Sequence, residues 1–194
     1  PDRTDSQIGP LADADLDLAV DTVIAGAFGQ SGQRCTATSR VLVAAEIADE
    51  FGARLAGAVS SLRVGSGLDA STQVGPLVSR GQRDSVVGFI ERAEQAGGVV
   101  QARGELSESL PANGCYVAPT LVGNVAADSE LWTDEVFGPV VALRSFTTLD
   151  EAIEAVNASA YGLSAAIFTQ SLSSSTTFTD RVEAGQVSVN LPTS

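Results

Sequence analysis

The chain contains no histidine, no lysine and no methionine in its 194 residues. Without an imidazole, nucleophile schemes of the Ser-His-Asp or Cys-His type are excluded within this polypeptide. The 11 basic side chains are all arginine and are outnumbered by 24 acidic ones, which gives a formal net charge of -13. Nucleic acids and anionic membranes attract positive charge, so this balance argues against either as a partner. The absence of methionine, the initiator included, predicts a processed chain or an excised fragment.

Long apolar runs and closely spaced cysteines are also missing. No stretch approaches the roughly 18 apolar residues that span a bilayer, and the first residues show no signal-peptide pattern. Cys35 and Cys115 stand far apart, with no C-x-x-C pair and no histidine to complete a zinc set. Neither a disulfide framework nor a metal site is therefore predicted. We expect a cytoplasmic protein with no membrane contact.

Helical and β-branched segments alternate along most of the chain. Apolar spacing and capping residues predict helices over 15–29, 46–62, 79–97, 148–158 and 172–183, with a short helical turn from 129. Strands are predicted over 40–44, 99–102, 116–125, 140–146, 164–168 and 186–190, with a surface loop over 104–114. This alternation predicts an α/β fold of three layers, in which helices cover both faces of a mostly parallel sheet. Functional groups are then expected at the carboxyl edge of the strands.

Cys35 is the first chemical candidate, because it follows a glycine-containing turn at the end of the first predicted helix. The neighbouring Arg34 and the backbone N–H groups of Gly32-Gln33 would stabilise a thiolate, or an oxyanion that forms on its target. The alternative is a small buried hydrophobic side chain, since free cysteine is among the most buried residue types. Cys115, at the start of a strand, lacks such neighbours and is interpreted as structural.

Glu135 and Phe137 form the second candidate, in the run Glu-Val-Phe-Gly-Pro-Val. A carboxylate can hold a polyol such as a ribose by two hydrogen bonds, and a phenyl ring offers a flat face to an aromatic ligand. The alternative is a helix-terminal charge beside a structural turn. Residues 190–193 are a third candidate and either line a pocket or only end the chain. No Gly-rich phosphate motif in the required strand-to-helix context occurs, so no nucleotide-phosphate site is predicted within this chain.

Together, four motifs resemble the catalytic domain of the aldehyde dehydrogenase superfamily. They are Asp13-Ala14-Asp15-Leu16-Asp17 with its helix, Gly32-Gln33-Arg34-Cys35-Thr36, Glu135-Val136-Phe137-Gly138-Pro139-Val140, and Tyr161-Gly162-Leu163-Ser164-Ala165 through Val187-Ser188-Val189-Asn190. The resemblance covers residues 11–194 and leaves 1–10 as a lead-in unlike the family. Within the family, residues 35–40 and 181–193 are most similar to enzymes acting on 2-oxoglutarate semialdehyde (2,5-dioxopentanoate).

The resemblance implies NAD- or NADP-dependent oxidation of a small-molecule aldehyde to a carboxylate, through a thiohemiacetal and then a thioester on Cys35. It implies that Glu135 holds the nicotinamide ribose and that Phe137 packs against the cofactor. Arg34, Thr36 and Leu191 would shape the substrate pocket, where a cationic Arg34 attracts a carboxylated aldehyde. A solvent-facing Arg34 is the alternative. The family also implies that the parent protein is a homo-oligomer.

The chain departs from the family at its first residues. The family's water-activating glutamate opens a Glu-Leu-Gly-Gly-Lys motif, and the corresponding positions here are Pro1-Asp2-Arg3-Thr4-Asp5. The dinucleotide-binding domain, with the asparagine that holds the oxyanion, has no counterpart in this sequence. We therefore expect a domain fragment that does not turn over alone. Two alternatives remain: a coenzyme A-acylating or phosphate-dependent reductase of the same superfamily, and a non-catalytic assembly module.

Overall fold

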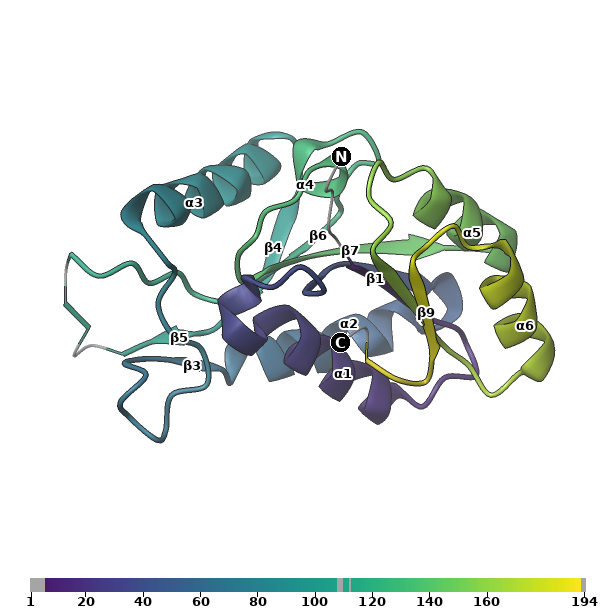
Figure 1. Cartoon of the computed structure of the whole chain (residues 1–194), viewed down its shortest axis with the longest axis horizontal. Helices are drawn as coiled ribbons and strands as arrows, with labels where there is room; N and C mark the ends of the chain where they lie inside the picture. Colours follow the sequence, from purple (N-terminus) through teal and green to yellow (C-terminus); the bar gives the residue numbers. More distant parts are fainter. Residues whose placement is uncertain (1–5, 108–109, 112, 193–194) are drawn as a thin grey trace.

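Seven strands form the central sheet of the computed structural model, which describes residues 6–107, 110–111 and 113–192 (Figure 1). Their order across the sheet is β4-β6-β7-β2-β1-β8-β9. Every neighbouring pair is parallel except β4 and β6, which run antiparallel. The strands are β1 (Ser6–Pro10), β2 (Thr38–Ala44), β4 (Val99–Arg103), β6 (Thr120–Gly123), β7 (Val140–Phe146), β8 (Ser164–Phe168) and β9 (Gln186–Val189). The predicted α/β class with a mostly parallel sheet is confirmed.

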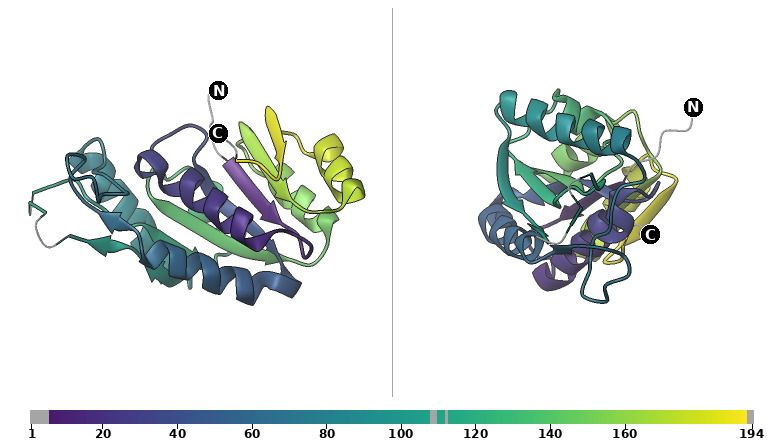
Figure 2. Two further views of the ribbon diagram at one scale, coloured as in Figure 1. Left: turned by 90° about the horizontal axis from the view of Figure 1, so that it is seen from below. Right: turned by 90° about the vertical axis from the view of Figure 1, so that its left-hand side faces the viewer.

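Helices cover both faces of the sheet and make the three layers (Figures 1 and 2). One face carries α1 (Leu16–Phe28) and α2 (Ala48–Ser60), and the other carries α3 (Arg80–Gln95), α4 (Glu130–Thr133), α5 (Leu149–Asn157) and α6 (Leu172–Arg181). Successive side chains of a strand point to opposite faces. In β2, accordingly, Val41 and Val43 pack with α1 and α2, while Leu42 and Ala44 join the second core.

Local signals start several of these helices where the sequence predicts. The side chains of Asp15, Ser79, Thr148 and Ser171 each accept a hydrogen bond from the backbone N–H three residues ahead. Such N-caps satisfy amide groups that have no partner within the helix, and each is worth about 1 kcal/mol. These starts therefore depend on neighbouring residues alone, which is why the sequence predicts them.

Strand β1 corrects the sequence interpretation. It lies between β2 and β8, near the middle of the sheet, and pairs in parallel with both. From the sequence, residues 1–10 are a lead-in unlike the family in which no strand is predicted, whereas residues 6–10 form a strand of the main sheet. Five residues ending in Gly9 and Pro10 give little strand signal, because both residue types are depleted in strands. Residues 1–5, which differ from the family's Glu-Leu-Gly-Gly-Lys motif, lie outside the described residues.

A second, two-stranded sheet lies beside the main one. It pairs β3 (Arg63–Val64) with β5 (Glu105–Leu106) in parallel, so the predicted loop over 104–114 contains a short strand. Within the part of the chain that the structure describes, no helix is long and apolar enough to cross a membrane.

Candidate functional site

Cys35, Glu135 and Phe137 lie where the parallel strands begin. Cys35 comes just before β2, and the other two come just before β7, the parallel neighbour of β2. Parallel neighbours begin at the same edge of a sheet, so the loops that precede β2 and β7 are brought together. The expectation of a site at the carboxyl edge is therefore wrong for these three residues.

The loop before Cys35 makes a left-handed turn that redirects the chain after α1. Gln30, Ser31 and Gly32 have φ angles of 51°, 57° and 69°, in a region that side chains other than glycine rarely adopt. The Ser31 hydroxyl donates to the carbonyl of Gly75 at 2.9 Å and so ties the turn to the chain beyond β3. Cys35 itself is exposed, so its interpretation as a buried hydrophobic side chain is wrong.

From the sequence we expect the backbone N–H groups of Gly32 and Gln33 to stabilise a thiolate or an oxyanion, but the structure uses the Gln33 N–H differently. The Gln33 N–H donates to the carbonyl of Gln30 at 3.1 Å, so it closes the turn and is not available to the thiol. The Gln33 side-chain oxygen accepts from the N–H of Val78 at 3.0 Å. By contrast, no acceptor among the described residues engages the Cys35 N–H. The Cys35 amide is therefore the backbone donor that remains available beside the sulfur.

The turn that carries Glu135 and Phe137 is also held in an uncommon conformation. Phe137 has a φ of 50°, and the residue is 39% exposed. The side-chain amide of Gln82, in the first turn of α3, donates to the carbonyls of Val136 and Phe137 at 3.1 and 3.0 Å. These two bonds hold the left-handed residue in place, so the phenyl ring stays at the surface. Strain of this kind is typical of functional turns.

The cysteine loop and this turn touch through two glycines. A Cβ placed on Gly32 would lie 2.2 Å from the carbonyl oxygen of Gly138 and 2.4 Å from its carbon. On the other side, a Cβ on Gly138 would meet the Val86 side chain at 2.5 Å. Only glycine permits this approach of two backbones. The exposed thiol and the Glu135 turn therefore belong to one packed unit.

A family model decides what this unit belongs to. The sequence model of the Aldehyde dehydrogenase family matches residues 6–194. The chain belongs to that family. The match includes β1, in contrast to the expected start at residue 11.

Two curated aldehyde dehydrogenases show how much of a relative the chain covers. It is 36% identical over 181 residues to malonate-semialdehyde dehydrogenase 1 of Geobacillus thermodenitrificans, covering 93% of this chain and 37% of the relative. It is 37% identical over 179 residues to alpha-ketoglutaric semialdehyde dehydrogenase of Bacillus subtilis, covering 92% and 37%. The chain therefore spans little more than a third of the length of these relatives.

A solved structure of the family shares the fold. This is a point mutant of betaine aldehyde dehydrogenase from Staphylococcus aureus in complex with NAD+, with a TM-score of 0.90 and 31% sequence identity. The match covers 97% of this chain and 38% of that one. This aldehyde dehydrogenase homologue binds NAD+.

Arg34 and Thr36 flank Cys35 and are both half-buried. The Arg34 Nε is shielded from solvent. Cys115, also half-buried, offers its carbonyl to the Leu77 N–H at 2.7 Å.

Leu191, which the resemblance places in the substrate pocket, comes just after the last strand of the sheet. It follows β9 at the edge where the parallel strands end, and it is 61% exposed. The preceding Asn190 is committed to the backbone of Thr169, which follows β8: it accepts from the Thr169 N–H at 3.0 Å and donates to the Thr169 carbonyl at 2.9 Å. Asp13, after β1, accepts from the Thr169 hydroxyl. Asn190 is therefore a structural clamp at the opposite edge from Cys35; residues 193–194 lie outside the described part.

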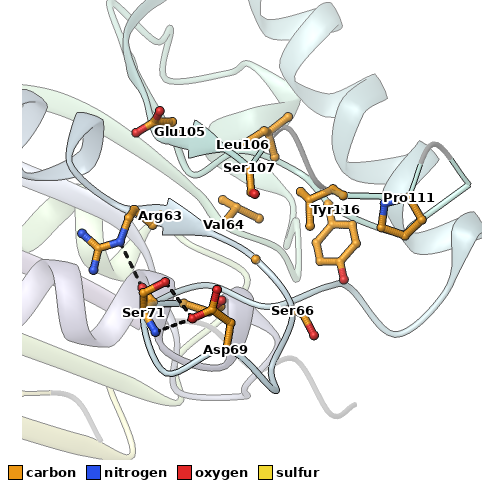
Figure 3. A pocket seen from close by; sticks show the side chains of 13 residues that line it. Arg63, Val64, Ser66, Asp69, Ser71, Glu105, Leu106, Ser107, Pro111 and Tyr116 are labelled. Atoms are coloured by element: carbon orange, nitrogen blue, oxygen red, sulfur yellow. Dashed lines mark hydrogen bonds between the residues drawn. The ribbon is translucent and has the colours of Figure 1, made fainter.

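A cavity of about 480 Å³ lies apart from the cysteine, between β3, β5 and Tyr116 (Figure 3). Its lining includes neither Cys35 nor Glu135. The Asp69 carboxylate at its rim accepts from the backbone N–H and the hydroxyl of Ser71, both at 2.8 Å. These bonds lower the pKa of Asp69 below its ordinary value of 3.8. They also close a tight turn between Asp69 and Ser71 at the rim of the cavity. Among the described residues, no group of three His, Cys, Asp or Glu side chains could hold a metal ion.

Sequence reasoning missed the residues behind the Glu135 turn. Arg40, on β2, is only 1% exposed and contacts Tyr161, whose hydroxyl reaches Glu135. An arginine at the head of an apolar strand is the signal that could have found it, because a buried cation requires partners.

Proposed function

We propose that this chain is the cysteine-bearing part of an NAD(P)-dependent aldehyde dehydrogenase that oxidises an aldehyde to a carboxylate, with Cys35 as nucleophile. One observation carries the proposal. The exposed Cys35 lies on a loop whose backbone packs, through Gly32, against the turn that holds Glu135 and Phe137. The thiol would react with an aldehyde, and the neighbouring carboxylate and aromatic ring would hold the nicotinamide riboside of the cofactor beside it.

In the first step the Cys35 thiol loses its proton to solvent water, and the resulting thiolate attacks the carbonyl carbon of the aldehyde. A C–S bond forms and the carbonyl electron pair moves to the oxygen, giving a thiohemiacetal oxyanion. The Cys35 N–H, which no acceptor among the described residues engages, would donate to that oxygen. No histidine is needed, because the thiolate is itself the nucleophile and its proton passes to solvent water.

The residues around the turn fit the nicotinamide-ribose end of the cofactor. Glu135 is a half-buried carboxylate, suited to accept from two ribose hydroxyls, and the exposed Phe137 ring offers a flat face. A bound NAD(P)+ would supply the acceptor for the hydride on the Cys35-bound carbon, and loss of that hydride would leave a thioester on the Cys35 sulfur. Water then adds to the thioester carbon, the C–S bond breaks, and carboxylate and Cys35 thiol are released.

We propose a semialdehyde that carries a carboxylate, of the 2-oxoglutarate semialdehyde kind, as substrate. Arg34 lies next to the nucleophile, and its permanent positive charge would attract a carboxylate on the substrate. The names of the relatives from Geobacillus and Bacillus, which act on malonate and alpha-ketoglutaric semialdehydes, support this class. Leu191 takes no part in the proposal. A reducing compartment such as the cytoplasm would keep Cys35 a thiol.

Acylation of Cys35 by an activated ester, p-nitrophenyl acetate, tests the nucleophile without cofactor. The sulfur attacks the ester carbonyl as it would an aldehyde, and nitrophenolate leaves with the electron pair. We expect one acetyl group on the Cys35 peptide by mass spectrometry, labile to hydroxylamine, and none on Cys115. Equal acetylation of both cysteines would contradict the proposal. Faster deacetylation by coenzyme A or phosphate than by water would instead support the acyl-transferring reductases.

The same protein, mixed with aldehyde and NAD+ or NADP+, should give no steady formation of reduced nicotinamide. The water-activating glutamate and the dinucleotide domain of the family have no counterpart in this sequence. Turnover at rates on the order of 1 per second, typical of enzymes, would contradict the expectation that the chain is inactive alone.

A further inference from the structure

Tyr161 lies behind the turn that carries Glu135. The backbone N–H of Glu135 donates to the Tyr161 hydroxyl at 3.0 Å. Tyr161 comes just before β8, and Glu135 just before β7, so the bond joins two loops at the edge where the parallel strands begin. It is the main chain of Glu135, and not its carboxylate, that this bond holds.

Arg40 holds Tyr161 in turn. The guanidinium carbon lies 5.1 Å from the centre of the Tyr161 ring, within the range of a cation–π contact. Its Nη1 donates to the hydroxyl of Ser159 at 2.9 Å, and the same hydroxyl accepts from the Tyr161 N–H at 3.1 Å. Both the ring and the backbone of Tyr161 are therefore held by one buried arginine of β2.

The same arginine reaches the turn directly. Its Nη2 approaches the carbonyl of Asp134 at 3.4 Å, so the residue before Glu135 is held as well. Because Arg40 is 1% exposed, these contacts are little screened by water, and the planar guanidinium orients all of them together. The strand that starts beside Cys35 thus carries the support for the Glu135 backbone.

We infer that Tyr161, oriented by Arg40, is a positioning residue that sets where Glu135 can hold a cofactor ribose. The inference rests on the proposed function in so far as Glu135 is the ribose-binding residue. A carboxylate binds two neighbouring hydroxyls well only when its backbone is already in place, because ordering it at binding would weaken affinity. Neither Tyr161 nor Arg40 touches a reacting atom.

The substitution Tyr161→Phe tests the link, since it keeps the ring over Arg40 and removes only the hydroxyl. Amide hydrogen exchange of the chain, followed residue by residue, should show the Glu135 N–H exchanging about fivefold faster, as expected for one lost hydrogen bond of ordinary strength. The matched control is Tyr116→Phe, at the only other tyrosine, which should leave the Glu135 rate unchanged. An unchanged Glu135 rate in Tyr161→Phe would overturn the inference.

A second measurement separates positioning from general loosening. Titration of the chain with NAD+, read from the amide resonances of Glu135 and Phe137, should give an apparent Kd about fivefold higher in Tyr161→Phe, the factor for one lost hydrogen bond, while alkylation of Cys35 proceeds at the wild-type rate. An unchanged Kd would overturn the positioning role. The dinucleotide-binding domain of the family has no counterpart in this sequence, so if NAD+ moves neither resonance in the wild-type chain, the exchange rates alone decide the Tyr161 link.

Discussion

Gly32 packs its Cα against the main-chain carbonyl of Gly138, although the two residues stand far apart in the sequence. A side chain on Gly32 would begin 2.2 Å from that oxygen, and its φ of 69° disfavours any other residue. Through this contact, the loop of Cys35 and the turn of Glu135 hold one another in place. It is therefore the point where the packing of the candidate site is most sensitive to change.

The substitution Gly32→Ala should destabilise the chain by about 2–4 kcal/mol, because the new methyl group collides with backbone and the residue must stay left-handed. Urea unfolding followed by circular dichroism measures the loss. Gly57→Ala is the matched control: Gly57 lies in α2, and nothing lies within 4 Å of the position that a methyl group would take there. At this position we expect about 0.5–1 kcal/mol of added stability. An equal change in the free energy of unfolding for both variants would contradict the close contact between Gly32 and Gly138.

Iodoacetamide should label Cys35 about tenfold or more faster than Cys115, since Cys35 is exposed and Cys115 is half-buried. The rates can be read from the two cysteine peptides by mass spectrometry under native conditions. Labelling in urea, where both thiols are free, serves as the control and should bring the rates together. Equal rates in the folded protein would remove Cys35 as the accessible thiol.

The charge of Arg34 should favour anionic reagents at Cys35. We expect Arg34→Gln to lower the ratio of iodoacetate to iodoacetamide labelling about threefold, the factor for a unit charge about 6 Å away in water. Arg103→Gln, which removes an exposed charge from the edge strand β4, should leave the ratio unchanged. A ratio that is equally insensitive to both substitutions would place Arg34 outside the substrate's reach and remove its support for a carboxylated aldehyde.

The substitution Asn190→Ala should cost about 2 kcal/mol of stability, because it removes two hydrogen bonds to Thr169 and leaves a left-handed backbone. Asn124→Ala offers a comparison at another left-handed asparagine, whose side-chain amide donates to the Gly97 carbonyl. It should cost about half as much, since one hydrogen bond is lost there in place of two. Chemical unfolding of both variants measures the difference, and a smaller loss for Asn190→Ala would contradict the clamp.

The hydrogen bonds from Ser71 to the Asp69 carboxylate should break on acidification only at a pH below the ordinary pKa of an aspartate. Hydrogen bonds from Ser71 lower the pKa of Asp69 in the folded chain. The stabilisation is therefore present above 3.8, the ordinary value, and is lost as the pH falls through the lower folded value. A ¹³C NMR titration of the carboxyl group should give a midpoint below 3.8. Ser71→Ala, which removes one of the two donors, should move that midpoint upward; no movement would exclude the hydroxyl as a cause.

Much of the fold follows from short-range sequence signals. The capping residues at positions 15, 79, 148 and 171 each accept a hydrogen bond from the first turn of the helix that follows. The apolar, β-branched run after Arg40 favours a buried strand through its own residues. Strand β1 escapes sequence reasoning for the opposite reason. Its five residues carry a weak pattern, and only pairing with β2 and β8 makes them a strand.

The candidate site divides in the same way. Cys35, Glu135 and Phe137 stand out as residue types in unusual local runs, and the family resemblance adds their roles. Tyr161 and Gln82 carry no such signal, because each acts on a backbone group distant in the sequence. The position of Leu191 is also beyond the reach of local patterns, since it depends on the direction of β9 within the sheet.

The sequence by itself determined most of the helices and the longer strands, the lack of any imidazole base and the cysteine that could act without one. These are properties of composition and of neighbouring residues. The tertiary structure alone decided that the thiol and the Glu135 turn meet where the parallel strands begin, that a buried Arg40 and Tyr161 support that turn, and that Asn190 joins the ends of β8 and β9. Each of these depends on strand order and on backbone contacts between distant segments, which local propensities do not encode.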